Sequence, residues 1–414
     1  MAKHSSSFPD HNQNFWQLSC IISASQNIVM ILIGGTLSKQ YGPATAISSI
    51  CIGNLILWLI GLAMISMTAK ERRNAIENVK EHLGKTGSFL ISVILIVAFL
   101  SWYMIEIQSV TSSITPLLAS ATQKTLVGSS LGLGIAILAM GGIRLIKHLT
   151  VTAFPFLLSY ILYGMFTSAL PSFGPIGIED FSFPATIIVV SLTLPGMVNL
   201  PTFFRHSKSQ TDSFLALTLI TIFDILFEIY SVFTQMTDPA EISAPLNSFS
   251  QHIPYATITL AFIGISSICL NLVNIYFASA ALQNISKKIT GPWGFLLVGL
   301  MGTVSYALLQ NSLTMEFLEI VSSNFIANLG VMLVLSLITS VIVKHRPRVF
   351  EKNINLSCWL LGCLVTLITQ ITYPQSITHS LLLGSTTIIL AFITILFFEE
   401  TIWSIKKIHG IKQK

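Results

Sequence analysis

Carboxyl groups inside apolar segments are the first candidates for chemistry in this sequence. Glu106 lies near the centre of an apolar segment over residues 88–118, one helical turn after Trp102 and on the same face. No Lys, Arg or His lies near the middle of any apolar segment, so Glu106 must bind a proton, face water, or meet a bound cation or solute donor. An aromatic ring one turn from a carboxyl suits a flat heterocycle, which stacks on the ring and is hydrogen-bonded at its edge. The alternative is a neutral structural acid bonded to a neighbouring helix.

Two amides share one helical face of the apolar segment 254–285. Asn271 and Asn274 lie on this face together with Ser267. An amide offers both a donor and an acceptor, which suits a ring that carries adjacent carbonyl and N–H groups. The alternative is hydrogen bonding between helices, a frequent role of Asn inside membranes.

A further pair of carboxyls lies in the apolar segment 214–236. Asp224 and Glu228 are four residues apart and therefore share one helical face. Two carboxyls this close do not ionise together easily, so both join Glu106 as candidates for handling a proton. The alternative is that this face opens to a wet crevice and that both acids are structural.

Polar and helix-breaking residues interrupt two apolar segments near their centres. They are Gln26 and Asn27 in segment 17–36, and Pro195 and Gly196 in segment 184–204. In the latter segment Asn199-Leu200-Pro201 follow as a second break. Breaks at corresponding places in two halves of a chain indicate an inverted-repeat transporter, whose solute binds at the breaks. We therefore expect these four residues at a binding site near the middle of the bilayer. The alternative is an ordinary proline kink.

The composition identifies the elements that must hold these residues. The chain of 414 residues is 52% hydrophobic and 9% charged, whereas soluble domains carry about 25% charged residues. Its apolar segments are mostly near the length of about 20 residues that crosses a bilayer, and in hydrocarbon such segments must be helices. The sequence predicts an all-α membrane protein with twelve transmembrane helices. The expected spans are roughly 17–36, 45–67, 88–118, 127–146, 149–169, 184–204, 214–236, 254–285, 292–310, 324–343, 356–372 and 381–402.

The organisation expected from these spans is two repeats of five helices and two further helices. The parts are a tail at 1–16, the first repeat at 17–169, the inverted repeat at 184–343, the last two helices at 356–402 and a tail at 403–414. The polar connection 69–87 contains apolar residues at helical spacing, which predicts a short amphipathic helix. Residues 1–16 are polar, so no cleavable signal peptide is expected.

The basic residues predict how the chain crosses the membrane. Of the 22 Lys and Arg residues, all but Lys39 and Lys124 fall on one side of the predicted spans. The positive-inside rule makes this side cytoplasmic, with both termini inside and the chain in the plasma membrane, here a bacterial inner membrane. The expected partners are a small-molecule solute and the lipid bilayer, not nucleic acid. The chain is expected to be a monomer or a weak oligomer.

Motifs of enzymes and cofactor sites are missing from the sequence. There is no HExxH, P-loop or GxSxG motif, and the His residues lie in predicted connections, span ends and tails. The five Cys residues all fall inside apolar segments and indicate neither a disulfide framework nor a metal site. We expect neither an enzyme nor a bound cofactor.

Short motifs spread along the chain resemble the cytosine permease branch of nucleobase–cation symport family 1, in the amino acid–polyamine–organocation superfamily. The motifs are Gly34-Gly35-Thr36-Leu37, Ile52-Gly53-Asn54-Leu55, Gly84-Lys85-Thr86-Gly87-Ser88, Trp102, Leu200-Pro201-Thr202-Phe203-Phe204-Arg205, Asn271, Tyr276 to Asn284-Ile285, and the basic patch before segment 356–372. The resemblance implies twelve helices in a LeuT-type, five-plus-five inverted repeat with broken first and sixth helices. It also implies a substrate site between the first, third, sixth and eighth helices, where Trp102 stacks on a heterocycle and Glu106 bonds its edge.

The sequence departs from this family at four functional positions. Family members often carry an amide at Glu106, a second aromatic residue near Thr193 and an acid at Thr202. Sodium-coupled members place a hydroxyl pair just before the eighth-helix Asn, where this chain has Cys269 and Leu270, which are poor ligands for a hard cation. These departures count against cytosine as the specific substrate and against sodium as the coupling ion.

The residues and the resemblance together predict a symporter that works by alternating access. It would import a nucleobase such as cytosine or a purine, or a related small heterocycle, with H⁺ as the coupling ion. A first alternative is a transporter of the same fold for an amino acid or amine, whose ammonium group would pair with Glu106. A second alternative is a non-transporting membrane scaffold or receptor.

Overall fold

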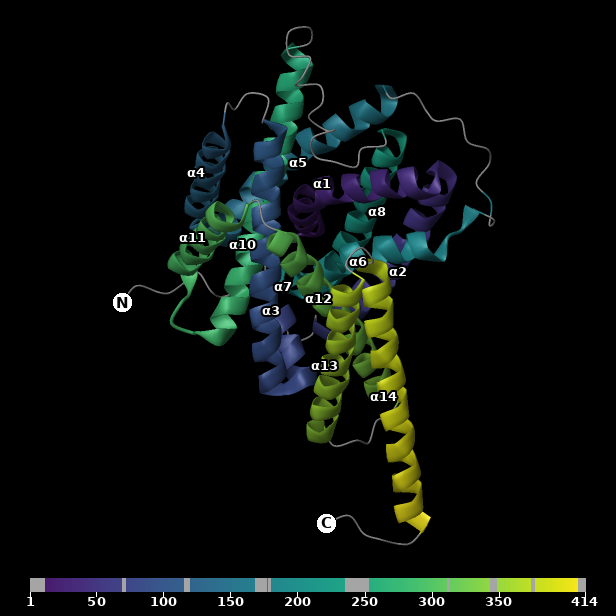
Figure 1. The fold of residues 1–414 in the computed structure, drawn as a ribbon. Coiled ribbons are helices and arrows are strands. Elements are labelled where there is room, and N and C mark those ends of the chain that lie inside the picture. Colours follow the sequence, from purple (N-terminus) through teal and green to yellow (C-terminus); the bar gives the residue numbers. More distant parts are fainter. Residues whose placement is uncertain are drawn as a thin grey trace.

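The computed structural model of the protein describes residues 12–68, 72–114, 120–167, 177, 180–234, 253–310, 313–342, 348–373 and 377–408. These residues form twelve long helices and the short helix α7 (Figure 1). The helices are α1 (Phe15–Tyr41), α2 (Pro43–Thr68), α3 (Ala75–Ser113), α4 (Ala121–Ala139), α5 (Gly142–Thr167), α6 (Phe183–Asn199), α7 (Pro201–Phe204), α8 (Gln210–Thr234), α10 (Ile253–Ile285), α11 (Gly291–Leu309), α12 (Leu313–Ile342), α13 (Arg348–Thr372) and α14 (Ile377–Ile408). The predicted tails at 1–16 and 403–414 lie largely outside the described residues.

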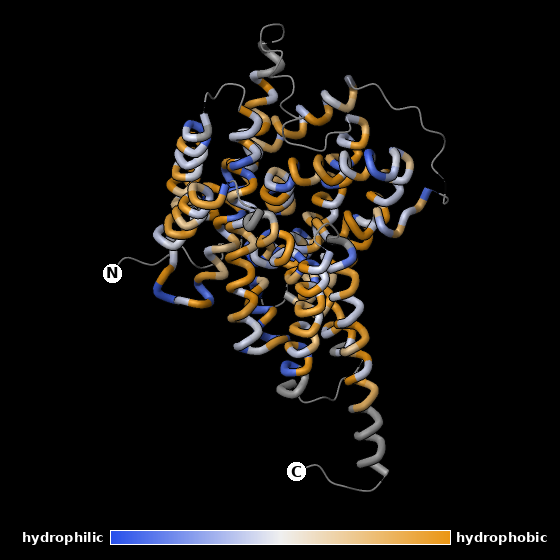
Figure 2. Tube along the Cα trace, in the orientation of Figure 1, coloured by the Kyte–Doolittle hydropathy of each residue, from blue (hydrophilic) through white to orange (hydrophobic). Residues whose placement is uncertain are grey.

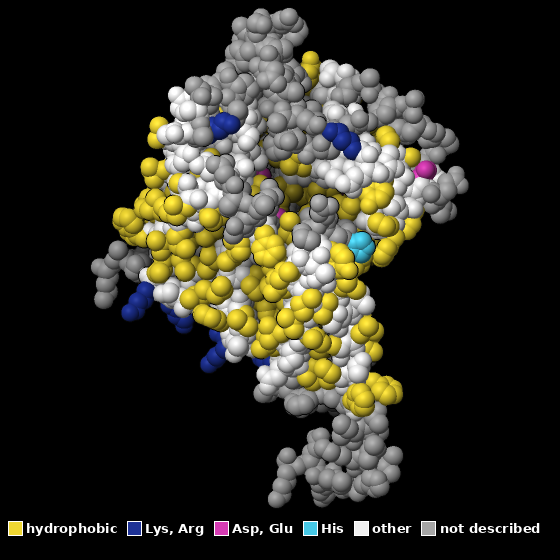
Figure 3. All heavy atoms as spheres, viewed as in Figure 1, with side chains coloured by type: hydrophobic (Ala, Val, Ile, Leu, Met, Phe, Trp, Pro, Cys, Tyr) yellow, Lys and Arg dark blue, Asp and Glu magenta, His cyan; other side chains and the backbone are white. Residues whose placement is uncertain are grey.

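Eleven of the long helices are long and apolar enough to cross a membrane. The remaining long helix, α4, carries Gln123 and Lys124 near its start, which lower its hydropathy. Hydrophobic residues lie along most of the helices (Figure 2). Hydrophobic side chains cover the middle of the face in Figure 3, with Lys and Arg side chains above and below them. The chain is therefore the multi-pass helical membrane protein that the sequence predicted.

The turn between the fourth and fifth long helices lies earlier than predicted. α4 ends at Ala139 and α5 begins at Gly142, which has a φ of 60° that glycine adopts readily. Arg144 and Lys147, expected in the connection, therefore lie in the first turns of α5. The Gly-Gly pair at 141–142 marked this turn, and the predicted boundary at 147–148 was wrong.

The centre of α1 is polar, but α1 is continuous from Phe15 to Tyr41. Ser25 Oγ donates to the main-chain carbonyl of Ile22 at 2.7 Å, and Asn27 Nδ2 donates to that of Ala24 at 3.0 Å. These local hydrogen bonds accommodate the polar side chains within an intact helix. The break predicted in this segment is therefore not present in the structure.

The sixth span is divided at the second of its two predicted breaks. Pro195 lies inside α6, which ends at Asn199, and α7 begins at Pro201 after the turn residue Leu200. Pro201 has no N–H group with which to continue the α6 hydrogen-bond ladder, so the division falls there. Asn199 Nδ2 donates to the carbonyl oxygen of Pro195 at 2.9 Å, so a side-chain hydrogen bond links Pro195 to the last residue of α6.

The start of α3 is the amphipathic helix predicted in the connection 69–87. Asn74 caps it, with its Oδ1 atom accepting from Glu77 N at 2.7 Å. Gly84, at a φ of 75°, separates this short segment from the spanning part of α3. Its apolar residues are all buried: Ala75, Ile76, Val79 and Leu83. The prediction is confirmed, and the apolar face packs within the protein.

The packing contacts within the bundle are repeated when each of the helices α1–α5 is replaced by its counterpart among α6, α8, α10, α11 and α12, and the reverse. α1 packs on α8 and α5, and correspondingly α6 packs on α2 and α12. α3 packs on α12 and α11, and correspondingly α10 packs on α5 and α4. Two structurally related halves produce this pairing. α13 and α14 lie side by side outside these ten helices (Figure 1). The repeat boundaries 17–169 and 184–343 stay a prediction that these contacts support.

The residues before α1 are joined to the turn after α7. Gln13 N donates to the main-chain oxygen of His206 at 3.1 Å, and Lys208 N donates to that of Gln13 at 2.9 Å. On the other side of this turn, His206 Nε2 lies 2.8 Å from the hydroxyl oxygen of Tyr276 in α10. These contacts tie α1, α7 and α10 together at the end of the bundle where α1 begins.

Candidate functional site

A central cavity lies between α1, α3, α6, α10 and α12. Its volume is about 70 Å³, which is below the range of about 300–1,000 Å³ that is usual for small-molecule sites. The residues that line it are Ile22, Ser25, Gln26, Val29, Met30, Ala98, Phe99, Trp102, Leu192, Thr193, Pro195, Gly196, Leu200, Leu270, Val273, Asn274, Phe277, Ser323 and Ile326. Four of these helices are the first, third, sixth and eighth spans, between which the resemblance placed the substrate.

Five of the predicted binding residues line the central cavity: Gln26, Trp102, Pro195, Gly196 and Asn274. Trp102 is held from α12, because its Nε1 atom donates to Ser323 Oγ at 3.4 Å. Gly196 lets α6 approach α1, since a Cβ atom there would lie 2.7 Å from Gln26 Nε2. The structure thus brings the polar centre of α1 against the Pro-Gly turn of α6, as expected from their types.

An aromatic pair in the cavity wall was missed by the sequence interpretation. Phe99 of α3 and Phe277 of α10 stack with ring centroids 4.8 Å apart and an interplanar angle of 24°. Phe99 precedes Trp102 by three residues and Phe277 follows Asn274 by three, so helical spacing placed each beside a predicted residue. Together with Trp102, they give the cavity aromatic surfaces on which a flat solute can lie.

Several polar atoms in the cavity wall have no partner within the described residues. They are Gln26 Oε1, Thr193 Oγ1 and Asn274 Nδ2. The first is an acceptor, the second can donate and accept, and the third is a donor. None of the described residues that line the cavity is charged. Such a wall suits an uncharged solute that carries both N–H and carbonyl groups at its edge.

Three predicted binding residues do not line the cavity: Asn27, Glu106 and Asn271. Asn27 lies two turns before Gly34 on the face of α1 that packs against α8. Asn271 is fully buried, and its Nδ2 atom donates to Ser267 Oγ at 3.4 Å within α10. Glu106 is 2% exposed, and its Oε2 atom has no hydrogen-bond partner in the described part of the chain.

The two acids of α8 also lie outside the cavity wall. We refer to Asp224 and Glu228 as the acidic pair. Both side chains are 0% exposed, and Glu228 Oε2 accepts a hydrogen bond from Asn54 Nδ2 of α2. α8 packs against α1, α2 and α5. The pair therefore forms a second polar site, separate from the cavity.

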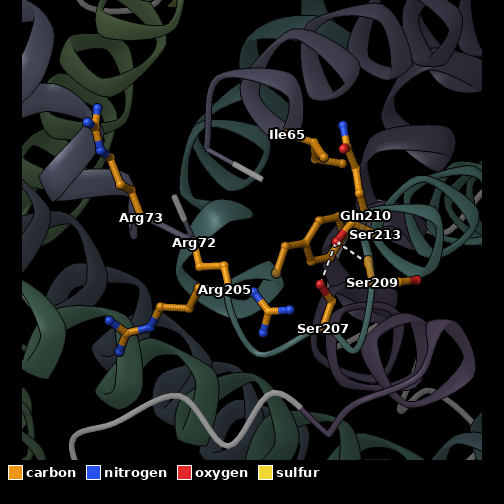
Figure 4. Close-up of a pocket in the computed structure, with 9 residues that line it drawn as sticks. Ile65, Arg72, Arg73, Arg205, Ser207, Ser209, Gln210 and Ser213 are labelled. Atoms are coloured by element: carbon orange, nitrogen blue, oxygen red, sulfur yellow. Dashed lines mark hydrogen bonds between the residues drawn. The ribbon is translucent and has the colours of Figure 1, made fainter. Parts of the chain in front are cut away.

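A small basic pocket of about 30 Å³ lies where α2 ends and α8 begins. Figure 4 shows the guanidinium group of Arg72 pointing toward the serines of this pocket, whereas those of Arg73 and Arg205 point away. Protein atoms engage all three: Arg72 donates to the Lys208 carbonyl at 3.4 Å, Arg73 pairs with Glu81 at 3.3 Å, and Arg205 donates to Tyr276 at 3.4 Å. We assign this pocket to the structure of the turn, not to a solute.

The fold and the cavity define a class of proteins, namely multi-pass helical membrane proteins in which two sets of five helices with equivalent packing contacts surround a central cavity. Mhp1, a nucleobase-cation-symport-1 family transporter solved in a closed conformation with bromovinylhydantoin bound, is similar over 95% of each chain, at a TM-score of 0.67 and 15% identity. A Na⁺-coupled sialic acid symporter in a substrate-bound outward-open state is similar over 94% of this chain and 91% of its own, at a TM-score of 0.66 and 11% identity. A manganese transporter from Eremococcus coleocola is similar over 98% and 99%, at a TM-score of 0.55 and 15% identity.

These neighbours are transporters and not enzymes, and they share the fold predicted from the sequence. The all-α, LeuT-type architecture is therefore confirmed, with the local correction in α1 described above. No family model matches the sequence, and no curated protein matches it in sequence. The likeness is one of fold at low identity, and it agrees with the family resemblance seen in the short motifs.

Proposed function

We propose that the protein is a secondary symporter that imports a nucleobase, such as cytosine or a purine, or a related small heterocycle. The observation that carries this proposal is the central cavity, with Trp102 and stacked phenylalanine rings beside uncharged amide and hydroxyl groups. A heterocycle would lie against Trp102, while Gln26 accepts from a ring N–H and Asn274 donates to a ring carbonyl. The likeness to a hydantoin-binding transporter supports the same class of solute.

The cavity also bears on the amino acid alternative. An amino acid carries an ammonium and a carboxylate group, and each needs a charged or strongly polar partner away from water. Glu106, the expected partner of an ammonium group, does not line the cavity, and no charged side chain does. This arrangement favours a neutral heterocycle over an amino acid or amine.

For coupling, we propose H⁺ as the driving ion. Three buried acids, Glu106, Asp224 and Glu228, lie inside the bundle, and Cys269-Leu270 replace the hydroxyl pair of sodium-coupled relatives. Sodium is the second candidate, because one structural neighbour is a Na⁺-coupled symporter. We further propose that the chain belongs to the cytosine permease branch of nucleobase–cation symport family 1 and lies in the plasma membrane with both termini cytoplasmic.

The test is a binding screen followed by a transport assay on purified protein. Cytosine, uracil, adenine and hypoxanthine are compared with neutral amino acids and small amines by thermal shift, because binding to the folded state raises Tm. At least one nucleobase should raise Tm and be accumulated in proteoliposomes under an inward pH gradient, with sodium and potassium interchangeable. A response to amino acids alone would refute the solute class, and strict sodium dependence would refute H⁺ coupling.

A further inference from the structure

The acidic pair lies in an interface that is closed on every side by described helices. Asp224, Glu228 and Asn54 are each 0% exposed. Asn27, 1% exposed, lies on the same face of α1 as Gly34. Gly34 itself meets α8 directly, since a Cβ atom there would lie 2.0 Å from the main-chain oxygen of Glu228. The helices α1, α2 and α8 thus meet at one buried site, where Asn54 bonds Glu228 and Gly34 lies against α8.

Hydrogen-bond acceptors outnumber donors at this site. Within the described residues, both carboxyl oxygens of Asp224 and the second oxygen of Glu228 have no partner. The amide oxygens of Asn54 and Asn27 also have none. The Nδ2 group of Asn54 donates to Glu228 Oε2 and to the Ile50 carbonyl, and that of Asn27 donates to the Ala24 carbonyl. Two ionised carboxyls without a cation would be strongly unfavourable in such surroundings. A protonated carboxyl, in contrast, supplies an O–H donor that a neighbouring amide oxygen can accept.

On the described helices that pack against α8, the basic side chains lie away from the level of the pair. α2 carries no charged residue, α1 carries Lys39 in its last turn, and α5 carries Arg144, Lys147 and His148 in its first turns. Lys39 is exposed and lies five residues, about 7.5 Å of helix, beyond Gly34. Phe154 meets Phe223 edge to face, which puts the basic start of α5 about 9 Å of helix away from the level of the pair. The other titratable groups on the four helices near the pair are Cys51, Tyr160 and Tyr230.

We propose that Asp224 and Glu228, with the amides of Asn54 and Asn27, form a buried proton-binding site at the α1–α2–α8 interface, separate from the central cavity. One H⁺ bonds to a carboxylate oxygen of the pair and makes a neutral acid, whose O–H donates to an amide oxygen. The described residues contain no group of three or more His, Cys, Asp or Glu side chains that could hold a metal ion. A proton removes one negative charge from the pair and supplies one donor to these acceptors.

The position of α1 links this site to the solute. Gln26 lines the cavity and Gly34 contacts Glu228, eight residues or about 12 Å along one continuous helix. Movement of α1 away from α8 would expose the pair to water and allow the proton to leave. This link rests on the proposed symport, whereas the proton site itself does not.

The experiment that tests the site needs no solute. Infrared difference spectra of purified protein at neutral pH, in H₂O and D₂O, detect the C=O stretch of a protonated carboxyl. Glu106 is also buried, so the comparison is made between E106Q and the triple variant E106Q/D224N/E228Q. We expect the band of a protonated carboxyl in E106Q and its loss in the triple variant. Asp224→Asn and Glu228→Gln keep the side-chain shape, and a symmetric size-exclusion profile checks that each variant is folded.

Three results would overturn the proposal: no band in E106Q, an equal band in the triple variant, or loss of the band when sodium replaces potassium. Cytosine uptake then tests the link to transport. D224N should exchange internal for external cytosine but fail to accumulate it against a gradient. If the band behaves as expected and no nucleobase binds, the proton site stands and the proposed solute class fails.

Discussion

The central cavity and the acidic pair lie against different faces of the same helix, and their chemistry is opposite. The cavity has aromatic surfaces and uncharged polar groups, and its wall holds no charged residue. The acidic pair has two carboxyls in a closed interface with unpartnered acceptors. α1 presents Gln26 to the cavity and Gly34 to α8. The difference indicates that recognition of the solute and storage of charge are carried by separate sites, which α1 connects.

The largest effect on this comparison is expected from Trp102→Ala. Loss of the stacking surface should abolish nucleobase binding in calorimetry. The protein should stay folded, because Trp102 borders a cavity that already exists and its removal only widens this cavity. Trp102→Phe should retain part of the affinity. Trp293→Ala is the matched control, since Trp293 is 72% exposed and is not among the residues that line the cavity. Unchanged affinity in Trp102→Ala would place the solute elsewhere.

A large effect on the fold, instead of on binding, is expected from Gly34→Ala. Its added methyl group would overlap the main-chain oxygen of Glu228, and such overpacking costs about 1–3 kcal/mol or more. The variant should show a lower Tm. Gly264→Ala is the control, because a Cβ atom there meets nothing within 4 Å. Equal Tm values for the two variants would contradict the close α1–α8 contact.

The two amides of α10 should separate binding from packing. Asn274→Ala should weaken nucleobase binding by about 1–3 kcal/mol, the cost of leaving a buried polar partner unsatisfied. Asn271→Ala should leave affinity unchanged and lower Tm, because Asn271 donates to Ser267 within α10 and does not line the cavity. The opposite pattern would move the binding site by one turn of α10.

The smallest effect is expected from Glu106→Gln. Glu106 does not line the cavity, so nucleobase affinity should change by less than about twofold, or about 0.4 kcal/mol. Accumulation driven by a pH gradient should also persist if the acidic pair carries the proton. A variant that binds normally but no longer accumulates solute would shift the proton site from α8 to α3.

Periodicity and charge predicted the helices well because membrane-spanning segments are constrained by length and backbone hydrogen bonding. They could not fix the α4–α5 turn, where Gly142 mattered more than the nearby Arg144 and Lys147. Residue type found Trp102, Gln26 and Asn274 in the cavity. It could not separate them from Glu106, Asn27 and Asn271, because the side of a buried helix that meets the cavity depends on packing against its neighbours. Phe99 and Phe277 were missed because isolated phenylalanines in apolar segments carry no polar signal.

The main-chain bonds between Gln13 and the turn after α7 have a consequence for measuring conformational change. Any state that opens this end of the bundle must separate Gln13 from His206 and Lys208, and so release two amide hydrogens from their carbonyl partners. The isotope exchange rates of the Gln13 and Lys208 amides would then report how often the end opens. Hydrogen–deuterium exchange measured by mass spectrometry on the peptides that contain these amides would therefore give the frequency of opening at this end without a chemical label and without a known solute.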